Sequence, residues 1–263
     1  MPGRLEQILS TTRQSLPALQ GRRAALEQDL ERAPSLPASF RSALRRPTVA
    51  VIAELKRRSP SSGSIREDLD PAHRAALYER HGAAAISVLT DGPFFGGSME
   101  DLRTAADNCS LPILRKDFIL DEVQVLEARA AGASAVLLIV RVLGNARLRS
   151  LLRYCGDLGL DALVEVHTQS ELEIALDSEA EIVGINSRDL DTFTIETEAA
   201  WRLLEKVPSA TIAVAESGIA GQADVLRVAR AGADAVLVGT ALSGSPAPEE
   251  LLRELSEVQR HDR

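Results

Sequence analysis

The sequence is poor in aromatic side chains, which make up 3% of its 263 residues. A core built from this composition relies on Ala, Val, Leu and Ile, and the 45% of residues that are hydrophobic suffice for a sizeable core. Cysteine is also scarce: Cys109 and Cys155 are the two present, and their spacing fits no metal-ligand motif. We predict two free thiols in a reducing compartment rather than a disulfide or a catalytic cysteine.

The chain also lacks an excess of positive charge and a long apolar run. Its formal net charge of −8 at pH 7 argues against nucleic acid or an acidic membrane as a partner. No run approaches the roughly 18 apolar residues of a membrane span, and the N-terminus has no basic-then-apolar signal pattern. We therefore expect a cytoplasmic protein. An anionic small substrate stays compatible with this charge, because a site can be locally positive on an acidic protein.

One short phrase recurs along the chain. It is seen as "ERHGAAAISVLT" from residue 79, "ARAAGASAVLLIV" from 128, "ARAGADAVLVGT" from 229 and, more loosely, "GDLGLDALVEV" from 156. Each copy is typical of a helix end, a capping glycine and then a buried strand. The predicted caps are Gly82, Gly132, Gly159 and Gly232. Their separations are near multiples of about 25 residues, the length that one strand–helix repeat requires.

Eight short apolar runs follow this repeat. They cover residues 49–55, 84–89, 111–115, 134–140, 161–166, 181–185, 211–215 and 234–239. Amphipathic stretches with apolar residues at helical spacing lie between them. Apolar strands alternating with helices indicate a parallel sheet covered by helices. We therefore predict an α/β fold in which residues 47–263 form a (βα)8 TIM barrel, with a doubly wound open sheet as the alternative.

Residues 1–46 stand outside the repeat. Their pattern predicts a helical extension, interrupted at Pro17 and Gly21. The extension has apolar side chains that it could bury against the barrel: Leu5, Ile8, Leu9, Leu26 and Leu30. We predict that it packs on the barrel, covering the base or shaping the mouth, rather than forming a flexible tail.

Polar residues follow nearly every apolar run, at the strand ends where a barrel carries its reacting groups. They are Glu54 and Lys56, Thr90, Lys116, Arg141, Glu165, Asn186 and Arg188, Glu216 and Ser217, and Gly239 and Thr240. A lone lysine at a strand end usually extends to water, and Glu54 with Lys56 could be an ion pair that only fills the barrel. Buried ion pairs gain little stability over apolar residues, however, so these charges favour a site.

Glu165 lies between apolar residues of its predicted strand. Burial there would raise its pKa and let it act as an acid or base near neutrality. His167 follows the same strand, and we interpret it as a bystander. Arg141, in "LLIVRVL", has no role that the pattern explains.

A second signal follows the last two strands, as "AESGIA" and "VGTAL". Small residues let backbone N–H groups approach an anion, and barrels often hold a phosphate in these two loops. Ser59, in the "SPSSG" loop after the first strand, could add donors from another side. The sequence therefore predicts a phosphorylated small-molecule substrate.

Five motifs together resemble indole-3-glycerol-phosphate synthase of tryptophan biosynthesis, a carbon–carbon lyase: "ELKRRSPSSG", "ISVLTDGPFFGGS", "LPILRKDFI", "GINSRDL" and "VAESGI". They occur in the family's order within residues 50–243, and the N-terminal extension is also similar. The resemblance implies ring closure without a cofactor or metal. Its substrate would be 1-(2-carboxyphenylamino)-1-deoxyribulose 5-phosphate, and its products indole-3-glycerol phosphate, carbon dioxide and water.

The resemblance also implies roles for individual residues. Lys116 would be the general acid of ring closure, and Glu165 and Lys56 would transfer protons in the dehydration. The remaining catalytic residues would be Glu54, which orients and ion-pairs the lysines, Asn186 and Ser217. The residues that bind the substrate would be Ser59, Phe95, Phe118, Leu137, Arg188, Leu190, Glu216, Gly218, Leu237, Gly239 and Thr240. Ser62 departs from a lysine that is common in the family, and Thr240 from a more usual Ser or Glu.

Two alternatives stay open at this point. A phosphate-binding barrel isomerase would need a Cys/Asp pair at strand ends, and the first strand ends without a cysteine. A non-enzymatic scaffold would have its strand-end charges scattered or neutralised. We expect a monomer, or at most a weak homo-oligomer, that binds neither nucleic acid nor membrane.

Overall fold

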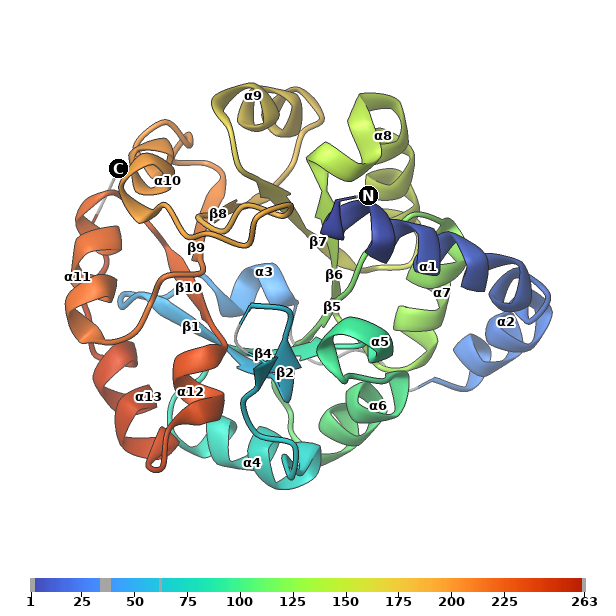
Figure 1. Cartoon of the computed structure of the whole chain (residues 1–263), viewed down its shortest axis with the longest axis horizontal. Coiled ribbons are helices and arrows are strands. Elements are labelled where there is room, and N and C mark those ends of the chain that lie inside the picture. The colour runs from blue at the N-terminus through green and yellow to red at the C-terminus, as the bar shows by residue number, and fades with distance from the viewer. Residues whose placement is uncertain (1–2, 34–38, 62, 262–263) are drawn as a thin grey trace.

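A computed structural model describes residues 3–33, 39–61 and 63–261 and contains a closed parallel barrel (Figure 1). Around the barrel the strands follow the order β1-β10-β9-β8-β7-β6-β5-β4. Their bounds are β1 Ala50–Leu55, β4 Ala85–Leu89, β5 Ile113–Lys116, β6 Ala135–Ile139, β7 Asp161–Val166, β8 Ile182–Asn186, β9 Ile212–Glu216 and β10 Ala235–Val238. Each predicted apolar run coincides with one of these strands. The (βα)8 barrel is confirmed, and the open sheet is excluded because β1 pairs with both β4 and β10.

Helices ring the barrel in Figure 1. The main ones are α4 Pro71–Arg80, α6 Met99–Asn108, α7 Glu122–Ala130, α8 Val140–Asp157, α9 Gln169–Asp177, α10 Thr197–Leu204, α11 Gln222–Arg230 and α13 Pro248–Ser256. Shorter pieces lie in the loops: the hairpin β2 Arg58–Ser59 and β3 Gly63–Ser64, α5 Gly92–Phe95 and α12 Thr240–Gly244. The predicted caps Gly82, Gly132, Gly159 and Gly232 all have positive φ, the conformation that favours glycine after a helix.

Alternate residues of each strand face the barrel interior and the surrounding helices. In β9, Ile212 and Val214 belong to the interior apolar cluster, whereas Ala213 and Ala215 belong to the cluster between sheet and helices. Glu216 continues the interior row and lines the cavity at its end. The same alternation therefore fills the barrel with apolar side chains and brings a polar row to its mouth.

The N-terminal extension contacts both ends of the barrel. It comprises α1 Arg4–Gln20, α2 Arg23–Arg32 and α3 Phe40–Ala43. At the base, the backbone N–H of Arg41 donates to Asp161 Oδ2 at 2.9 Å, where β7 begins. At the mouth, Arg4 Nη1 donates to the carbonyl of Pro60 at 2.7 Å, and its guanidinium lies 5.4 Å from the Phe193 ring centre. The extension thus contacts both the base and the mouth of the barrel. The division of the chain at residue 46 stays a prediction.

The apolar side chains of this extension hold it in place. Leu5, Ile8 and Leu9 belong to the interior cluster, and Leu26 packs with the α7 residues Val123 and Leu126. A flexible tail is therefore contradicted over the described residues. The predicted interruption at Pro17 is wrong, because α1 continues to Gln20. Pro17 is exposed, so the carbonyl that loses its N–H partner there can face water.

Two predictions from composition are checked directly. Cys109 and Cys155 are both free thiols, as predicted. Among the helices within the described ranges, none combines the length and apolarity needed to cross a bilayer.

Candidate active site

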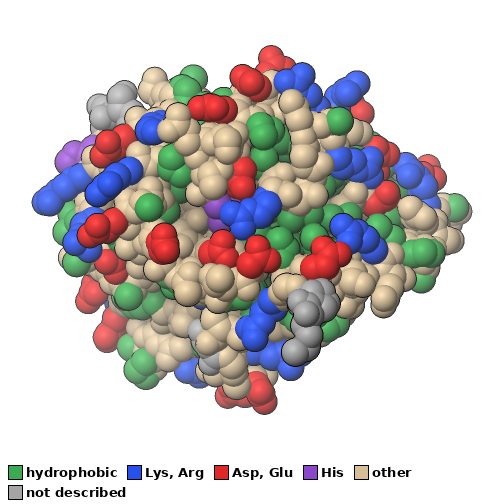
Figure 2. Space-filling view, turned by 45° about the horizontal axis from the view of Figure 1, so that its top comes forward, with side chains coloured by type: hydrophobic (Ala, Val, Ile, Leu, Met, Phe, Trp, Pro, Cys, Tyr) green, Lys and Arg blue, Asp and Glu red, His purple; other side chains and the backbone are tan. Residues whose placement is uncertain are grey.

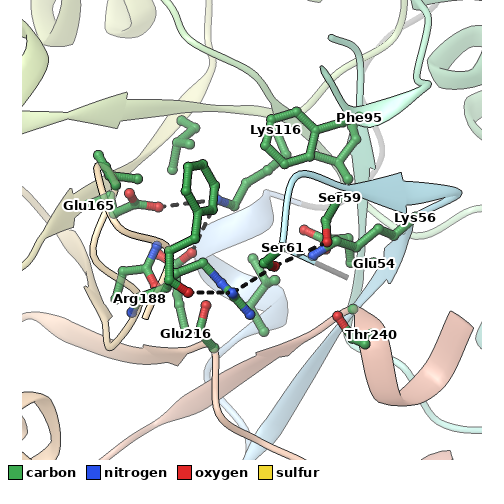
Figure 3. Close-up of a pocket in the computed structure, with 18 of the residues that line it drawn as sticks. Glu54, Lys56, Ser59, Ser61, Phe95, Lys116, Glu165, Arg188, Glu216 and Thr240 are labelled. Atoms are coloured by element: carbon green, nitrogen blue, oxygen red, sulfur yellow. Dashed lines mark hydrogen bonds and ion pairs between the residues drawn. The ribbon is translucent and has the colours of Figure 1, made fainter. Parts of the chain in front are cut away.

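A cavity of about 420 Å³ opens at the carboxyl ends of the barrel strands (Figure 3). It is lined by all the residues for which the resemblance implies a catalytic or substrate-binding role: Glu54, Lys56, Ser59, Phe95, Lys116, Phe118, Leu137, Glu165, Asn186, Arg188, Leu190, Glu216, Ser217, Gly218, Leu237, Gly239 and Thr240. Two lysines and three glutamates thus share one cavity, as the strand-end pattern predicted. Their roles in a reaction stay proposals.

Lys116 lies between two buried carboxyl groups (Figure 3). Its Nζ is 3.1 Å from Glu165 Oε2 and 3.4 Å from Glu216 Oε2. Burial alone lowers the pKa of the ammonium, but the charges of Glu165, Glu216 and Glu54 outweigh it and raise the pKa above its ordinary value. Lys116 is therefore a cation that two carboxyl groups hold in a fixed position.

The two carboxyl groups differ in pKa. Burial pushes the pKa of Glu165 upward, but Lys116, His167 and a hydrogen bond from Asn186 bring it below its ordinary value. At Glu216 burial dominates, and the charge of Glu165 adds to it, so the pKa rises to about 8. The expectation of a raised pKa at Glu165 is wrong, because sequence neighbours do not reveal which carboxyl Lys116 and Asn186 contact most closely. The surroundings therefore favour the carboxylate form at Glu165 and the carboxylic acid form at Glu216.

Two glycines make room for buried carboxyl groups. A Cβ at Gly184, in β8, would collide with Glu216 Oε1, and one at Gly239 would collide with Glu54 Oε1. A glycine inside a strand often marks such a close approach. The sequence analysis used "VGTAL" and "GINSRDL" as motifs, but it did not anticipate that Gly184 and Gly239 make room for carboxyl groups.

Glu54 and Lys56 form a second pair on β1 and the loop after it. Lys56 Nζ lies 3.5 Å from Glu54 Oε1. Ser243, on α12, accepts from the backbone N–H of Lys56 at 3.2 Å and donates to the Glu54 carbonyl at 3.1 Å. α12 thus holds the end of β1. Glu54 pairs directly with Lys56, and its negative charge also raises the pKa of Lys116.

The cavity has an apolar wall and a polar rim. The predicted apolar residues Phe95, Phe118, Leu137 and Leu190 are joined by Leu89, Ile139, Phe193, Ile195, Ile219, Ala220 and Ala241, which the sequence analysis missed. Other missed residues are Ser61, Asp91 and Asp117. Arg188 Nη1 donates to Ser61 Oγ at 2.9 Å and to the Phe193 carbonyl at 3.0 Å, so it ties the loops after β8 and β1 together (Figure 3).

The loop after β9 has an unusual backbone. Ser217 and Gly218 have φ values of 61° and 74°, in the left-handed region. A non-glycine residue held there costs energy and is found most often at functional sites. A Cβ at Gly218 would also collide with Thr197 Cγ2, so glycine is required at this position.

Two predicted strand-end residues, Thr90 and Arg141, do not line the cavity. Thr90 donates to Asp117. Arg141 pairs with Glu171 at 3.2 Å and with Asp189 at 3.3 Å, which gives it a structural role. His167, interpreted as a bystander from the sequence, does not line the cavity either, but its Nε2 lies 3.5 Å from Glu165 Oε1. That interpretation stays a prediction.

Ser62, at the departure from the family's usual lysine, lies outside the described residues. Within the described ranges, no group of three or more His, Cys, Asp or Glu side chains could hold a metal ion. Lys116, Lys56 and the three glutamates of the cavity are residue types that can donate or accept protons.

A model of the indole-3-glycerol phosphate synthase family matches residues 5–255. The chain belongs to this family. Its relatives in the family include one from Parafrankia sp., 47% identical over 260 residues that cover 98% of this chain and 96% of the relative. Another, from Dehalococcoides mccartyi, is 46% identical and covers 95% of this chain and 99% of the relative. Both carry the name indole-3-glycerol phosphate synthase.

Solved structures outside the indole-3-glycerol phosphate synthase family share the fold at low identity. A thiamine phosphate pyrophosphorylase from Pyrococcus furiosus matches with a TM-score of 0.59 and 18% identity, over 82% of this chain and 96% of that one. At this identity the match shows the barrel fold alone.

Proposed function

We propose that this chain catalyses the indole-3-glycerol phosphate synthase reaction, with Lys116 as the general acid of ring closure. The reaction converts 1-(2-carboxyphenylamino)-1-deoxyribulose 5-phosphate to indole-3-glycerol phosphate, carbon dioxide and water. The observation that carries the proposal is Lys116, a buried ammonium 3.1 Å from Glu165 and 3.4 Å from Glu216 at the mouth of the barrel. A positioned acid of this kind contributes typically about 10²–10⁴-fold to a rate.

The cavity walls suggest how the substrate lies. The aromatic ring would pack against Phe95 and Phe118, and the phosphate would bind near Ser217 and Gly218, with Ser59 as a further donor. Between them, the ketose carbonyl would face Lys116. Arg188 and Asn186 are placed to hold the substrate carboxylate and hydroxyl groups, because a guanidinium matches a carboxylate in geometry.

Ring closure would begin with attack by the ring carbon that bears the carboxylate on the ketose carbonyl carbon. As the carbon–carbon bond forms, the carbonyl oxygen takes a proton from Lys116 Nζ and becomes a hydroxyl. Loss of carbon dioxide leaves its electron pair in the ring and restores aromaticity. Glu165, ionised at neutral pH, stabilises the ammonium before this step, and the amine that is left afterwards regains its proton from the solvent.

Dehydration would complete the reaction. The hydroxyl leaves as water when an acid protonates it, and a base removes the proton from the neighbouring carbon. Lys56 and Glu165 are our candidates for these two transfers. Lys56 has Glu54 3.5 Å away to stabilise its charged form, and Glu165 shares the cavity with it.

One assay tests the proposed activity. Purified protein is mixed with the carboxyphenylamino ketose phosphate, and indole fluorescence and released carbon dioxide are followed together. We expect both products in equal amounts, and no signal when the protein is omitted. A folded protein that releases neither product would contradict the proposal.

The two alternative functions are less well supported. The isomerase would need a cysteine at a strand end, whereas Cys109 caps the end of α6 and Cys155 is buried in α8. A scaffold without activity would not require glutamates and lysines to converge in one cavity, where their burial costs stability. We therefore propose a phosphorylated small molecule as the ligand of this cavity.

A further inference from the structure

His167 is buried directly behind the proposed catalytic carboxylate. It follows β7 by one residue, and 5% of its side chain is exposed. Its Nε2 faces Glu165 Oε1 at 3.5 Å. On the other side of the ring, Nδ1 lies 3.3 Å from Glu171 Oε2, and the backbone N–H of His167 donates to that same oxygen at 2.7 Å. The imidazole is therefore held between two carboxyl groups, one in the cavity and one on α9.

Glu171 is fixed in turn from the outside. Arg141, in the first turn of α8, donates through Nε to Glu171 Oε1 at 3.2 Å and pairs with Asp189, in the loop after β8, at 3.3 Å. The segments that follow β6, β7 and β8 thus meet around His167. This gives Arg141 the role that its sequence context did not explain.

The two oxygens of Glu165 have different surroundings. Oε2 accepts from Lys116 Nζ, whereas Oε1 has no hydrogen bond to any of the described residues. His167 Nε2 also lacks one among them, and the two atoms face each other slightly beyond hydrogen-bond distance. A shift of a few tenths of an ångström would join them. An imidazolium, which donates through both nitrogens, would satisfy Glu165 and Glu171 together.

We propose that His167 is a positioning residue for Glu165. It acts through Oε1, and so turns Oε2 toward Lys116 and the substrate. His167 does not line the cavity, so it would not touch the substrate itself. The inference rests on the proposed function, because it assigns a task to the carboxylate that the proposed mechanism uses. Side chains behind a functional group commonly orient it in this way.

The test uses His167→Leu, which fills similar space without a donor, and His167→Gln, whose amide can still donate. Turnover by the unaltered protein is measured first, so that a failure of the proposed function is seen separately. We expect the leucine variant to lose about tenfold in kcat with KM changed by less than about threefold, the scale of one hydrogen bond to a charged group. The glutamine variant should recover part of that loss. His73→Gln, on an exposed face of α4, is the matched control and should match the unaltered protein.

Three results would overturn the proposal: a leucine variant with unaltered kcat, a loss that falls on KM alone, or no recovery with glutamine. If the leucine variant fails to fold, Glu171→Gln loosens His167 from its other side and should lower kcat with little change in KM. An unaltered kcat in a folded Glu171→Gln protein would count against the proposal in the same way.

Discussion

Arg115 and Lys116 are neighbours at the end of β5 and point to opposite faces of the barrel wall. Arg115 points outward, where Nε, Nη1 and Nη2 donate to Thr90, Glu127 and Asp117 at 3.2, 2.9 and 3.1 Å. Lys116 points inward to Glu165 and Glu216, each of which keeps an Oε1 atom with no hydrogen bond among the described residues. The outer cluster has its hydrogen bonds made, whereas the inner one keeps two buried carboxyl oxygens without one: Glu165 Oε1 faces His167, and Glu216 Oε1 lies against Gly184.

Arginine in the outer cluster and lysine in the inner cluster suit these different surroundings. Arginine stays protonated and its planar fork suits fixed bidentate pairs, whereas lysine can release a proton. The chain has only three lysines among its 30 basic residues, and two of them, Lys56 and Lys116, line the cavity. The surface, by contrast, relies on arginine, and on the face shown in Figure 2 basic and acidic side chains are interspersed. A buried cation is thus a structural residue or a reactive one according to what surrounds it.

Removing the inner cation should give the largest effect. In Lys116→Met we expect kcat to fall about 10³-fold, because the general acid is lost, while KM changes far less. Steady-state kinetics measures both, and circular dichroism checks the fold. Lys206→Met, at the third and exposed lysine, is the control and should keep full activity. A Lys116→Met protein with near-normal turnover would remove Lys116 from the acid role.

Removing the outer cation should instead destabilise the fold. Arg115→Met leaves the buried carboxylates Asp117 and Glu127 without their partner, which typically costs about 3–5 kcal/mol. Denaturant unfolding measures the free energy, with the exposed Arg149→Met as a control expected within about 0.5 kcal/mol of the unaltered protein. A stable but inactive Arg115→Met protein would contradict the contrast between a structural outer cluster and a reactive inner one.

Crowding the inner cluster should give a smaller effect. A Cβ in Gly184→Ala would collide with Glu216 Oε1, so we expect a loss of about 1–3 kcal/mol in stability, as for other overpacked sites, and a reduced kcat. Gly156→Ala is the matched control: it lies within α8 with open space around it, and alanine there should stabilise by about 0.5–1 kcal/mol. Equal unfolding free energies for the two variants would show that Glu216 can move aside freely.

The inner cluster also shows what could be predicted from the sequence. Two-residue alternation and the strand–helix repeat place Lys116, Glu165 and Glu216 on inward rows that end together, so the barrel and the convergence of these charges were predictable. Their protonation states were not, because these depend on distances between residues about 50 and 100 positions apart in the chain. The surroundings of His167 were hidden for the same reason, since its partner Glu171 comes from the next helix and Arg141 from the one before.

Glu216 should also change how stability depends on pH. Burial raises the pKa of Glu216 from 4.5 to about 8, so between these pH values the native protein keeps a proton that the unfolded chain releases. The free energy of unfolding should therefore fall as the pH rises through this window. Glu216→Gln cannot ionise, and its stability should decline less over the same range. Denaturant unfolding at several pH values between about 5 and about 8 measures both slopes, with the exposed Glu205→Gln as a control that keeps the decline. Parallel slopes in the unaltered protein and Glu216→Gln would mean that Glu216 is already ionised at pH 7, and that the cavity holds two carboxylates around Lys116.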